Sequence, residues 1–305
     1  MADAAATRIV VTGVNGFVGH HLAAELTANG IDVVGIGIES TAPSSLDGLL
    51  ADYVAADLIA EWPSVGPVDA VIHLAGLAAV GPSFDQPQRY ISVNSSIVTN
   101  LGEGLLASGA SPRAVLVSSG AIYDGTQPLP LTEDSTIAIN SPYAVSKILN
   151  ENQAAYYRGR GLDFVIARPF NHIGPGQGPG FLLPDLAAAL ATGEEPLKAG
   201  NLDTRRDYTD VRDVARAYRL LATQPTLRHD VYNICSGRSL SGNDILAELL
   251  KASGRSEVRT ETDDSRLRPN DPIDIVGDNS RLRGDLGWAP QFSIGDTVAD
   301  YLKAL

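Results

Sequence analysis

Short apolar runs alternate with longer amphipathic stretches along the first half of the chain. The runs predict strands, and the stretches between them, with apolar residues at helical spacing, predict helices. The expected strands are Arg8–Thr12, Asp32–Ile38, Tyr53–Ala56, Asp69–Leu74, Ala114–Ser118 and Asp163–Ala167, and the expected helices are Phe17–Ala28, Gln86–Ala107 and Pro142–Arg158. Strands that are apolar almost throughout are typical of a parallel sheet covered on both faces. The pattern therefore predicts an α/β fold with a doubly wound parallel sheet and a ligand at the carboxyl ends of its strands.

The character of the chain changes after residue 167. Glycine, proline and asparagine gather in RPFNHIGPGQGPG (168–180), and short strands and loops rich in Arg and Asp follow. Further helices are expected at Phe181–Ala191, Val211–Ala222, Gly242–Ser253 and Ile294–Leu302. We therefore expect a first lobe over residues 1–167 and a smaller α/β lobe over residues 168–305, partly interleaved with the first.

Composition narrows the class of protein. Of 305 residues, 44% are hydrophobic and 19% are charged, which is typical of a globular domain. A net charge of −13 disfavours binding to nucleic acid or to an acidic membrane surface. No run approaches the ~18 apolar residues of a membrane span, and the opening MADAAAT lacks the basic start of a signal peptide. Cys235 is the only cysteine, so the chain cannot form an internal disulfide, and we expect a cytoplasmic protein. Cys235 ends the apolar run 231–235, so we expect it to be buried.

A glycine motif follows the first expected strand. Gly13, Gly16 and Gly19 are spaced G-x-x-G-x-x-G and open the first expected helix. The first glycine allows a tight turn, the second lets backbone amides approach a diphosphate, and the third lets the helix pack on the sheet. The helix N-terminus faces the anion with free amides and a positive dipole. We therefore expect a dinucleotide here, with further contacts from Asn15, Phe17 and Val18 of the same turn.

The end of the second strand bears on which dinucleotide binds. An acidic residue at this strand end usually accepts hydrogen bonds from the adenosine ribose of NAD. Gly37 holds that slot and Glu39 follows two residues later, so a solvated loop acid is an equally good interpretation of Glu39. No Lys or Arg occurs between Arg8 and Arg89, which leaves a 2′-phosphate without a nearby cation. NAD is therefore slightly favoured over NADP, although nearby serines can also hold a phosphate.

Two further strand ends are candidates for cofactor contacts. Asp57 and Leu58 follow the third expected strand, where a carboxylate could meet the adenine amino group. Leu74, Ala75 and Gly76 end the fourth with small residues, as expected where backbone runs along a cofactor.

A tyrosine and a lysine lie four residues apart at the start of the third expected helix. Ser141 suits the N-cap and Pro142 the first turn, which places Tyr143 and Lys147 on one helix face. A free phenol has a pKa near ~10, and a neighbouring ammonium lowers that pKa towards neutrality. Ser119 follows a strand at the same sheet edge and can donate to a carbonyl oxygen while Tyr143 exchanges a proton with it. With a nicotinamide, these side chains predict a carbonyl/alcohol redox site.

Taken in order, the glycine turn, the hydroxyls at a strand end and the Tyr-Lys helix resemble the extended short-chain dehydrogenase/reductase superfamily. The resemblance covers nearly the whole chain. It implies a dinucleotide-binding Rossmann lobe near residues 1–167 and a nucleotide-sugar lobe after it. It also implies that Ser119, Tyr143 and Lys147 form the catalytic triad, that the lysine contacts the nicotinamide ribose, and that the Asp-Leu pair after the third strand contacts adenine.

Several motifs resemble those of GDP-4-keto-6-deoxy-mannose reductases within that superfamily. They are SSGAIY (118–123), Arg168–Asp185, Arg205–Tyr218 and Arg268–Trp288. In the related 4,6-dehydratases, acids follow the catalytic hydroxyl, whereas Gly120 and Ala121 follow it here. Dehydration needs a general acid–base at that place, so the sequence disfavours it. Ala121 also departs from the reductases, in which an acid often stands there, and this leaves the exact substrate open.

The diphosphate of a nucleotide sugar needs cations, and arginine is the best bidentate partner. Arg205, Arg206 and Arg268 are the candidates, of which the first and last match the family. A surface salt bridge with nearby aspartates is the alternative for each. Asn171 can hold a sugar or phosphate oxygen, and Lys198 can contact the base.

Other polar residues receive structural interpretations. Asp207, Asp210 and Asp213 are expected to cap and charge a helix start rather than bind a metal, because no oxygen-rich loop accompanies them. His172 lies in the loop of the second lobe, and both packing and a substrate contact are open for it.

Together these features predict an NAD(P)H-dependent reductase of a nucleotide-linked 4-keto-6-deoxyhexose, of the GDP-4-keto-6-deoxy-mannose type. Tyr143 would protonate the nascent oxygen at C4, Ser119 would orient the carbonyl, and Lys147 would lower the pKa of the tyrosine. Two alternatives remain. One is a nucleotide-sugar 4-epimerase with tightly bound NAD, and the other is a non-catalytic dinucleotide-sensing protein.

The family usually pairs its subunits through two helices, here Gln86–Ala107 and Pro142–Arg158. We therefore expect a homodimer. The alternative is that the apolar faces of these helices serve only the core of one chain. The apolar positions considered for the interface are Ile91, Ile97, Leu101, Leu105 and Ile148.

Overall fold

A seven-stranded sheet forms the centre of the molecule, in the order β10-β6-β5-β4-β1-β2-β3 with every pairing parallel. The computed structural model describes residues 7–193, 195–255, 257–264 and 271–305. The strands of this sheet are β1 (Arg8–Thr12), β2 (Asp32–Gly37), β3 (Asp52–Ala55), β4 (Ala70–His73), β5 (Arg113–Val117), β6 (Phe164–Pro169) and β10 (Val231–Ile234). This arrangement confirms the predicted α/β fold with a doubly wound parallel sheet.

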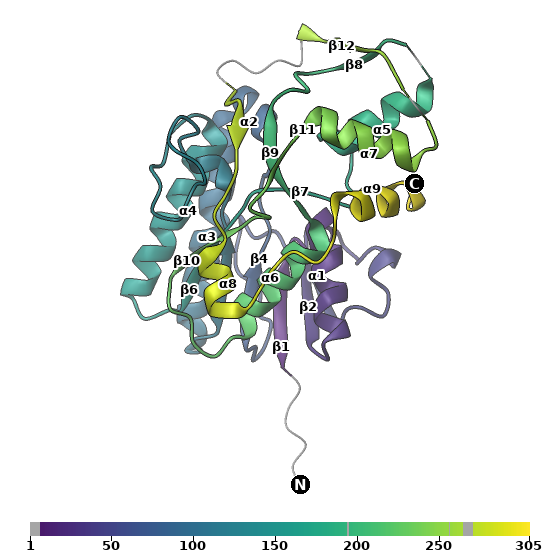
Figure 1. The fold of residues 1–305 in the computed structure, drawn as a ribbon. Coiled ribbons are helices and arrows are strands. Elements are labelled where there is room, and N and C mark those ends of the chain that lie inside the picture. Colours follow the sequence, from purple (N-terminus) through teal and green to yellow (C-terminus); the bar gives the residue numbers. More distant parts are fainter. Residues whose placement is uncertain (1–6, 194, 256, 265–270) are drawn as a thin grey trace.

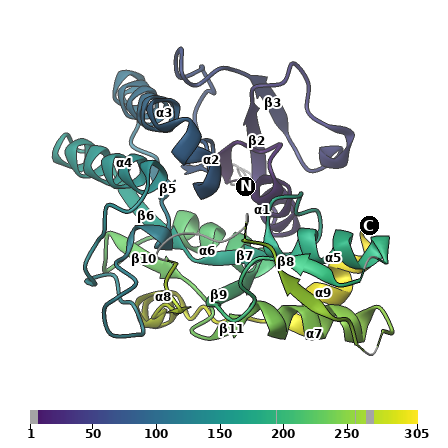
Figure 2. The same cartoon turned by 90° about the horizontal axis from the view of Figure 1, so that it is seen from above.

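Helices cover both faces of the sheet (Figures 1 and 2). The helices on one face are α1 (Phe17–Ala28) and α6 (Val211–Thr223), and those on the other are α3 (Pro87–Ser108) and α4 (Pro142–Gly159). Each face has its own apolar cluster: Leu22 and Tyr218 lie in the first, and Leu101 and Tyr157 lie in the second. The two clusters explain why the strands read as apolar on both faces.

A second group of elements lies over the carboxyl ends of the strands. Figure 1 shows this group beyond the end of the sheet that lies opposite the start of β1. Strand β9 (Arg205–Asp210) pairs with β7 (Asn171–Ile173), β11 (Ser239–Ser241) and β13 (Asp274–Ile275), and β8 (Leu197–Ala199) pairs with β12 (Thr260–Thr262). A third apolar cluster joins these strands to α5 (Leu182–Thr192), α7 (Gly242–Ala252) and α9 (Ile294–Lys303).

Short elements complete the described fold. They are α2 (Val80–Asp85), α8 (Ser280–Leu286) and the 3-10 turns η1 (Ser44–Leu46) and η2 (Gly120–Ile122). Cys235 follows β10 and is buried, as predicted. No helix among the described residues combines the length and apolar character needed to cross a membrane.

Strand β6 extends beyond its predicted end at Ala167. It continues to Pro169 because β10 pairs with it as far as the register of Ile234 with Pro169. The expected strand ended at Ala167, where the composition changes, but Arg168 continues it and is buried in the structure. Two later elements join this part of the fold: β10 pairs with β6 in the sheet, and α6 packs on one face of it. The lobe boundary after residue 167 stays a prediction.

Capping chemistry sets the helix starts. Ser141 accepts a hydrogen bond from the amide of Ala144 at 3.1 Å, and Pro142 is the first residue of α4, as predicted. Asp210 caps α6 by accepting from the amide of Arg212 at 2.8 Å. The helix that carries the predicted tyrosine and lysine therefore has a fixed starting point at the edge of the sheet.

Candidate active site

The turn between β1 and α1 requires its glycines. Gly13 has a φ of +69°, and a Cβ there would lie 3.0 Å from the backbone of Ala75. A Cβ on Gly19 would lie 2.4 Å from the carbonyl oxygen of Val14, so the helix could not pack as it does. Gly16 is the N-cap of α1, and no side chain caps the helix. The first amides of α1 are thus available to an anion, and the loop fits the diphosphate of a dinucleotide.

Glu39 lies beside this turn. The side-chain nitrogen Nδ2 of Asn15 donates to the Glu39 carboxylate at 2.5 Å, and the Tyr53 hydroxyl donates to the Glu39 backbone carbonyl at 2.9 Å. A Cβ on Gly37 would lie 2.6 Å from Asn15 Nδ2, which explains the glycine at the slot where an acid was expected. The sequence left Glu39 open between a ribose contact and a solvated acid, and it gave no sign of the part played by Tyr53. In the structure, Asn15 holds the Glu39 carboxylate beside the glycine turn.

The third strand end does less than the sequence suggested. The Asp57 carboxylate accepts from the amide of Ile59 at 2.9 Å and forms a local turn, and its side chain is exposed. Leu58 is buried in the apolar cluster on the α3 and α4 face. No contact in the described residues tests whether either one meets adenine, so that assignment stays a prediction.

Asn94 on α3 holds the loop that follows β4. The Asn94 side chain accepts from the amide of Leu77 at 2.8 Å and donates to the Leu77 carbonyl at 3.1 Å. It also donates to the Ser146 hydroxyl of α4 at 2.9 Å. Gly76 has a φ of +145°, and a Cβ there would approach Asn94 Oδ1 to 2.9 Å. The loop is therefore tied at Leu77, through Asn94, to the helix that carries the tyrosine.

The structure brings the predicted triad together where β5 ends and α4 begins. Ser119 follows β5 and hydrogen-bonds the side chain of Tyr143. The Lys147 ammonium donates to the Val117 carbonyl at 2.8 Å and lies 5.8 Å from the centre of the Tyr143 ring. Both side chains from α4 are buried, with 6% and 7% of their surface exposed. This is the constellation that a proton transfer to a substrate oxygen needs.

Burial sets the protonation states of these groups. It raises the pKa of Tyr143 to about 12, and the Ser119 hydrogen bond opposes this rise. Burial also lowers the pKa of Lys147 to about 8. The sequence predicted that Lys147 lowers the pKa of Tyr143, and this was wrong for the structure as it stands, because desolvation of the phenol dominates. At neutral pH the phenol holds its proton and is a donor, not a base.

His73 at the end of β4 is a neighbour that the sequence reasoning missed. Its Nδ1 lies 2.9 Å from the Thr12 hydroxyl, and its Nε2 is buried with no partner among the described residues. Burial, together with the nearby charge of Lys147, lowers its pKa to about 3. The only signal in the sequence was a histidine that closes an otherwise apolar strand.

The candidate substrate residues are spread over the second group of elements. Asn171 is exposed on β7, next to β9. Arg205 on β9 donates to the Ser239 carbonyl at 2.7 Å, and 41% of its side chain is exposed. Arg206 is held by Asp271 at 2.7 Å, so the salt-bridge interpretation applies to it. Arg268 lies outside the described residues.

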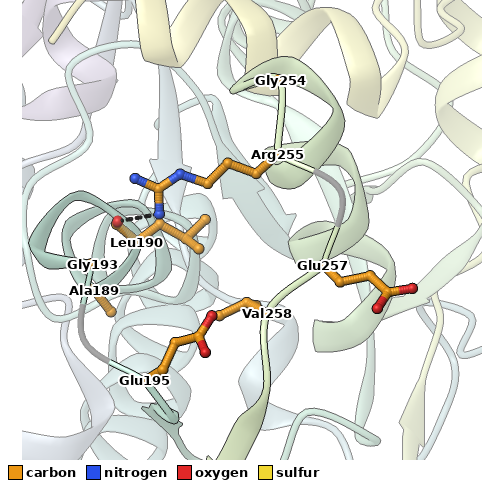
Figure 3. Close-up of a pocket in the computed structure, with 8 residues that line it drawn as sticks. All are labelled: Ala189, Leu190, Gly193, Glu195, Gly254, Arg255, Glu257 and Val258. Atoms are coloured by element: carbon orange, nitrogen blue, oxygen red, sulfur yellow. Dashed lines mark hydrogen bonds between the residues drawn. The ribbon is translucent and has the colours of Figure 1, made fainter.

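Two hollows lie beside α5, away from the triad. Lys198 lines one of about 360 Å³ together with Asp185. The other, of about 310 Å³, lies where α5 and α7 end (Figure 3). There Arg255 reaches across to the Leu190 carbonyl at 2.6 Å and satisfies a free acceptor of the helix end. Arg255, the arginine that lines this second hollow, is therefore engaged in holding the end of α5.

The aspartates in and after β9 accept hydrogen bonds from backbone amides of other segments. Asp207 accepts from the amides of Ser236 and Gly237, and Asp213 accepts from the amides of Gln291 and Phe292. Within the described ranges, no three His, Cys, Asp or Glu side chains come together as a metal site would require.

His172 lies beside the glycine turn. Its ring stacks on Phe17 with 6.1 Å between the ring centres, and its Nδ1 lies 3.1 Å from the Phe170 carbonyl. Burial lowers its pKa. The packing interpretation is therefore satisfied, and the stack connects the second group of elements to the start of α1.

Comparison with known proteins gives a consistent result. The sequence profile of the NAD dependent epimerase/dehydratase family matches residues 9–235. The chain is 35% identical to the GDP-6-deoxy-D-mannose reductase of Pseudomonas aeruginosa over 97% of this chain and 96% of that protein. It is 27% identical to a UDP-glucose 4-epimerase of Pisum sativum over 97% of this chain and 95% of that protein.

Solved structures agree. RMD from Pseudomonas aeruginosa, complexed with NADPH, is 32% identical, with a TM-score of 0.81 over 98% of both chains. The NAD-dependent NDP-hexosamine 5,6-dehydratase TunA is 30% identical, with a TM-score of 0.85 over 98% of this chain and 97% of that one. Profile, relatives and structures confirm the resemblance drawn from the motifs. The chain therefore belongs to the NAD-dependent epimerase/dehydratase family and is an NAD(P)-dependent oxidoreductase.

Proposed function

We propose that the protein reduces a nucleotide-linked 4-keto-6-deoxyhexose at C4, with GDP-4-keto-6-deoxy-mannose as the substrate type. The observation that carries the proposal is the meeting of Ser119 with the buried Tyr143 and Lys147 where β5 ends and α4 begins. The similarity to a GDP-6-deoxy-D-mannose reductase over nearly the full length of both chains supports the same reaction.

Each member of the triad has one task in this reaction. A bound reduced dinucleotide supplies the hydride. Ser119 donates a hydrogen bond to the C4 carbonyl oxygen and fixes its orientation. Tyr143 gives its proton to the same oxygen as negative charge develops there. Lys147, one helical turn from the phenol, is assigned to the nicotinamide ribose.

Dehydration is disfavoured by the turn that follows the serine. Gly120 and Ala121 occupy the positions at which the 4,6-dehydratases carry acids, and neither can move a proton. A Cβ on Gly120 would lie 2.9 Å from the Phe170 ring, which favours glycine there.

NADH is proposed as the preferred cofactor. The Glu39 carboxylate is fixed beside the glycine turn by Asn15, where it can accept from the ribose hydroxyls and repel a 2′-phosphate. No Lys or Arg from the segment between Arg8 and Arg89 is available to neutralise that phosphate. The related RMD structure contains NADPH, so this preference rests on the residues of this chain.

The substrate diphosphate is assigned to arginines of the second group of elements. Arg205 has an exposed guanidinium with Asp244 3.5 Å and Asp274 3.9 Å away, and it can turn towards a phosphate. Arg268 is assigned on its motif alone. Asn171 on the neighbouring strand is assigned to a sugar or phosphate oxygen, and Lys198 to the base.

A 4-epimerase is the alternative, supported by the epimerase relatives. The two functions separate in one experiment on the purified protein. A reductase should oxidise one NADH for each 4-keto-6-deoxy sugar nucleotide that it reduces. Its kcat/KM should be at least ~10-fold higher with NADH than with NADPH. An epimerase would retain NAD through purification and form product without added NAD(P)H. Dinucleotide binding without turnover would favour the non-catalytic alternative.

A further inference from the structure

A buried ion pair lies one helical turn beyond Lys147. Tyr143, Lys147 and Glu151 are spaced four residues apart on α4 and lie on one buried face of that helix. Arg168 on β6 holds both oxygens of the Glu151 carboxylate, through Nε at 2.9 Å and Nη2 at 2.7 Å. The pair is almost fully buried, with 6% of the arginine side chain and 9% of the glutamate side chain exposed. Two parallel hydrogen bonds fix the guanidinium and the carboxylate relative to each other.

The same guanidinium also holds the turn that carries Ser119. Arg168 Nη1 donates to the Tyr123 hydroxyl at 2.8 Å and to the Glu133 carbonyl at 3.0 Å. Tyr123 is the C-cap of η2, and Ser119 is its N-cap. One side chain of β6 therefore connects the two parts of the triad, the helix of Tyr143 and the turn of Ser119.

Glu151 also acts on Lys147 through its charge. Burial disfavours the ammonium, and the negative charge of Glu151 opposes that effect and raises the pKa of Lys147. The other groups that face these side chains are the Val117 carbonyl on β5, the neutral His73 on β4 and the guanidinium on β6. Glu151 therefore favours the charged form of Lys147 and opposes the effect of burial.

We propose that the Glu151–Arg168 ion pair is the positioning unit of this active site. It holds the helix of Tyr143 and Lys147 against the Ser119 turn, and it presents a fixed negative charge to the Lys147 ammonium. Neither residue contacts the substrate. The inference deepens the proposed function and rests on it for its consequence in catalysis, but its physical content concerns the protein alone.

The charge on Lys147 can be measured without substrate or cofactor. Labelling with acetic anhydride over a range of pH, read by mass spectrometry, gives the pH at which each lysine is half charged. For wild-type protein the midpoint of Lys147 should lie above pH 7, and a midpoint at or below pH 7 would overturn the proposal. This outcome depends on no variant and therefore stands even if a substitution prevents folding.

The Glu151→Gln variant removes the charge and keeps the shape. The Lys147 midpoint should fall by about 1 pH unit, and Glu151→Asp, which keeps the charge, should restore most of it. The matched control is Glu103→Gln, which breaks the exposed Glu103–Arg160 pair at the far end of α4. That control should leave the Lys147 midpoint unchanged. An equal midpoint in wild type and Glu151→Gln would contradict the charge role.

The Tyr123→Phe variant tests the hold on the serine turn. It removes the hydroxyl that accepts from Arg168 and donates to Asn233. Amide exchange in the 118–124 segment should therefore become at least about tenfold faster, the equivalent of one hydrogen bond or more. Unchanged exchange would overturn this role. A shifted midpoint and faster exchange in a protein that turns over no 4-keto sugar nucleotide would reject the proposed function and leave this inference intact.

Discussion

At the scale of the residue, burial decides what the triad can do. A phenol whose pKa is about 12 keeps its proton at neutral pH, and an ammonium whose pKa is about 8 keeps most of its charge. Helical spacing was enough to predict that Tyr143 and Lys147 share a face. It could not predict that Lys147 turns to the Val117 carbonyl, because that acceptor comes from another element. Desolvation is a property of the whole environment, so its dominance could not be derived from spacing.

His73 should make the fold sensitive to acid. Its pKa is lowered to about 3 in the folded state from an ordinary value of 6.5. A lowered folded-state pKa means that its contribution to stability is complete above pH 6.5 and is lost as the pH falls towards 3. Urea denaturation of His73→Asn should therefore show a free energy of unfolding that falls less steeply with acid, by up to about 1.4 kcal/mol per pH unit.

The control for this prediction is His20→Asn. His20 hydrogen-bonds the exposed Ser45 hydroxyl near the surface, and its substitution should leave the slope with pH unchanged. If His73→Asn and wild-type protein lose stability in parallel between pH 6.5 and pH 4, the account of the buried neutral imidazole is wrong.

At the scale of the element, the strand–turn–helix unit of β1 and α1 does two separate jobs. Gly19 lets the helix approach the preceding backbone, and Gly16 leaves the helix N-terminus open. The first job concerns packing, and the second concerns the ligand. The two glycines should therefore respond differently to the same substitution.

Gly19→Ala places a methyl group 2.4 Å from the Val14 carbonyl oxygen, where backbone must move. It should lower the free energy of unfolding by about 1–3 kcal/mol. Gly16→Ala meets only the Gly13 carbonyl at 3.2 Å, so it should cost under about 1 kcal/mol of stability and yet weaken dinucleotide binding at least ~10-fold. Denaturant melts and calorimetric titration with NADH measure the two effects. Equal loss of stability in both variants would contradict this division.

The elements were predictable because their signals are local. Apolar runs gave the strands to within one or two residues, and Ser141 with Pro142 gave the start of α4. The buried pair of Glu151 with Arg168 was not predictable, because its members are separate in the sequence and each looks like an ordinary surface charge. The same holds for the Asn94 link between a loop and α4. What the sequence missed is which polar groups meet across elements.

At the scale of the whole molecule, the homodimer stays a proposal with a revised surface. Ile97, Leu101 and Leu105 lie in the core of the chain, so the core alternative applies to them. Ile91 and Ile148 are half-buried. The outward side of α4 instead carries the exposed Leu149 and Tyr156, which lie seven residues apart, two helical turns along one face.

Light scattering should give twice the mass of one chain for wild-type protein. Tyr156→Glu places a charge on the proposed interface and should shift the protein to the mass of a single chain. The matched variant Ile273→Glu changes an exposed apolar residue that lies on neither α3 nor α4 and should leave the mass doubled. A single-chain mass for wild type at micromolar concentration would remove the homodimer from this account.

The Tyr143→Phe variant tests the central claim, that one buried phenol delivers the proton to C4. Its rate of NADH oxidation with a GDP-linked 4-keto-6-deoxyhexose should be compared with wild type at neutral pH. The account predicts a fall in kcat of at least about 10²-fold, with binding of NADH retained. Turnover of the variant near the wild-type rate would contradict it.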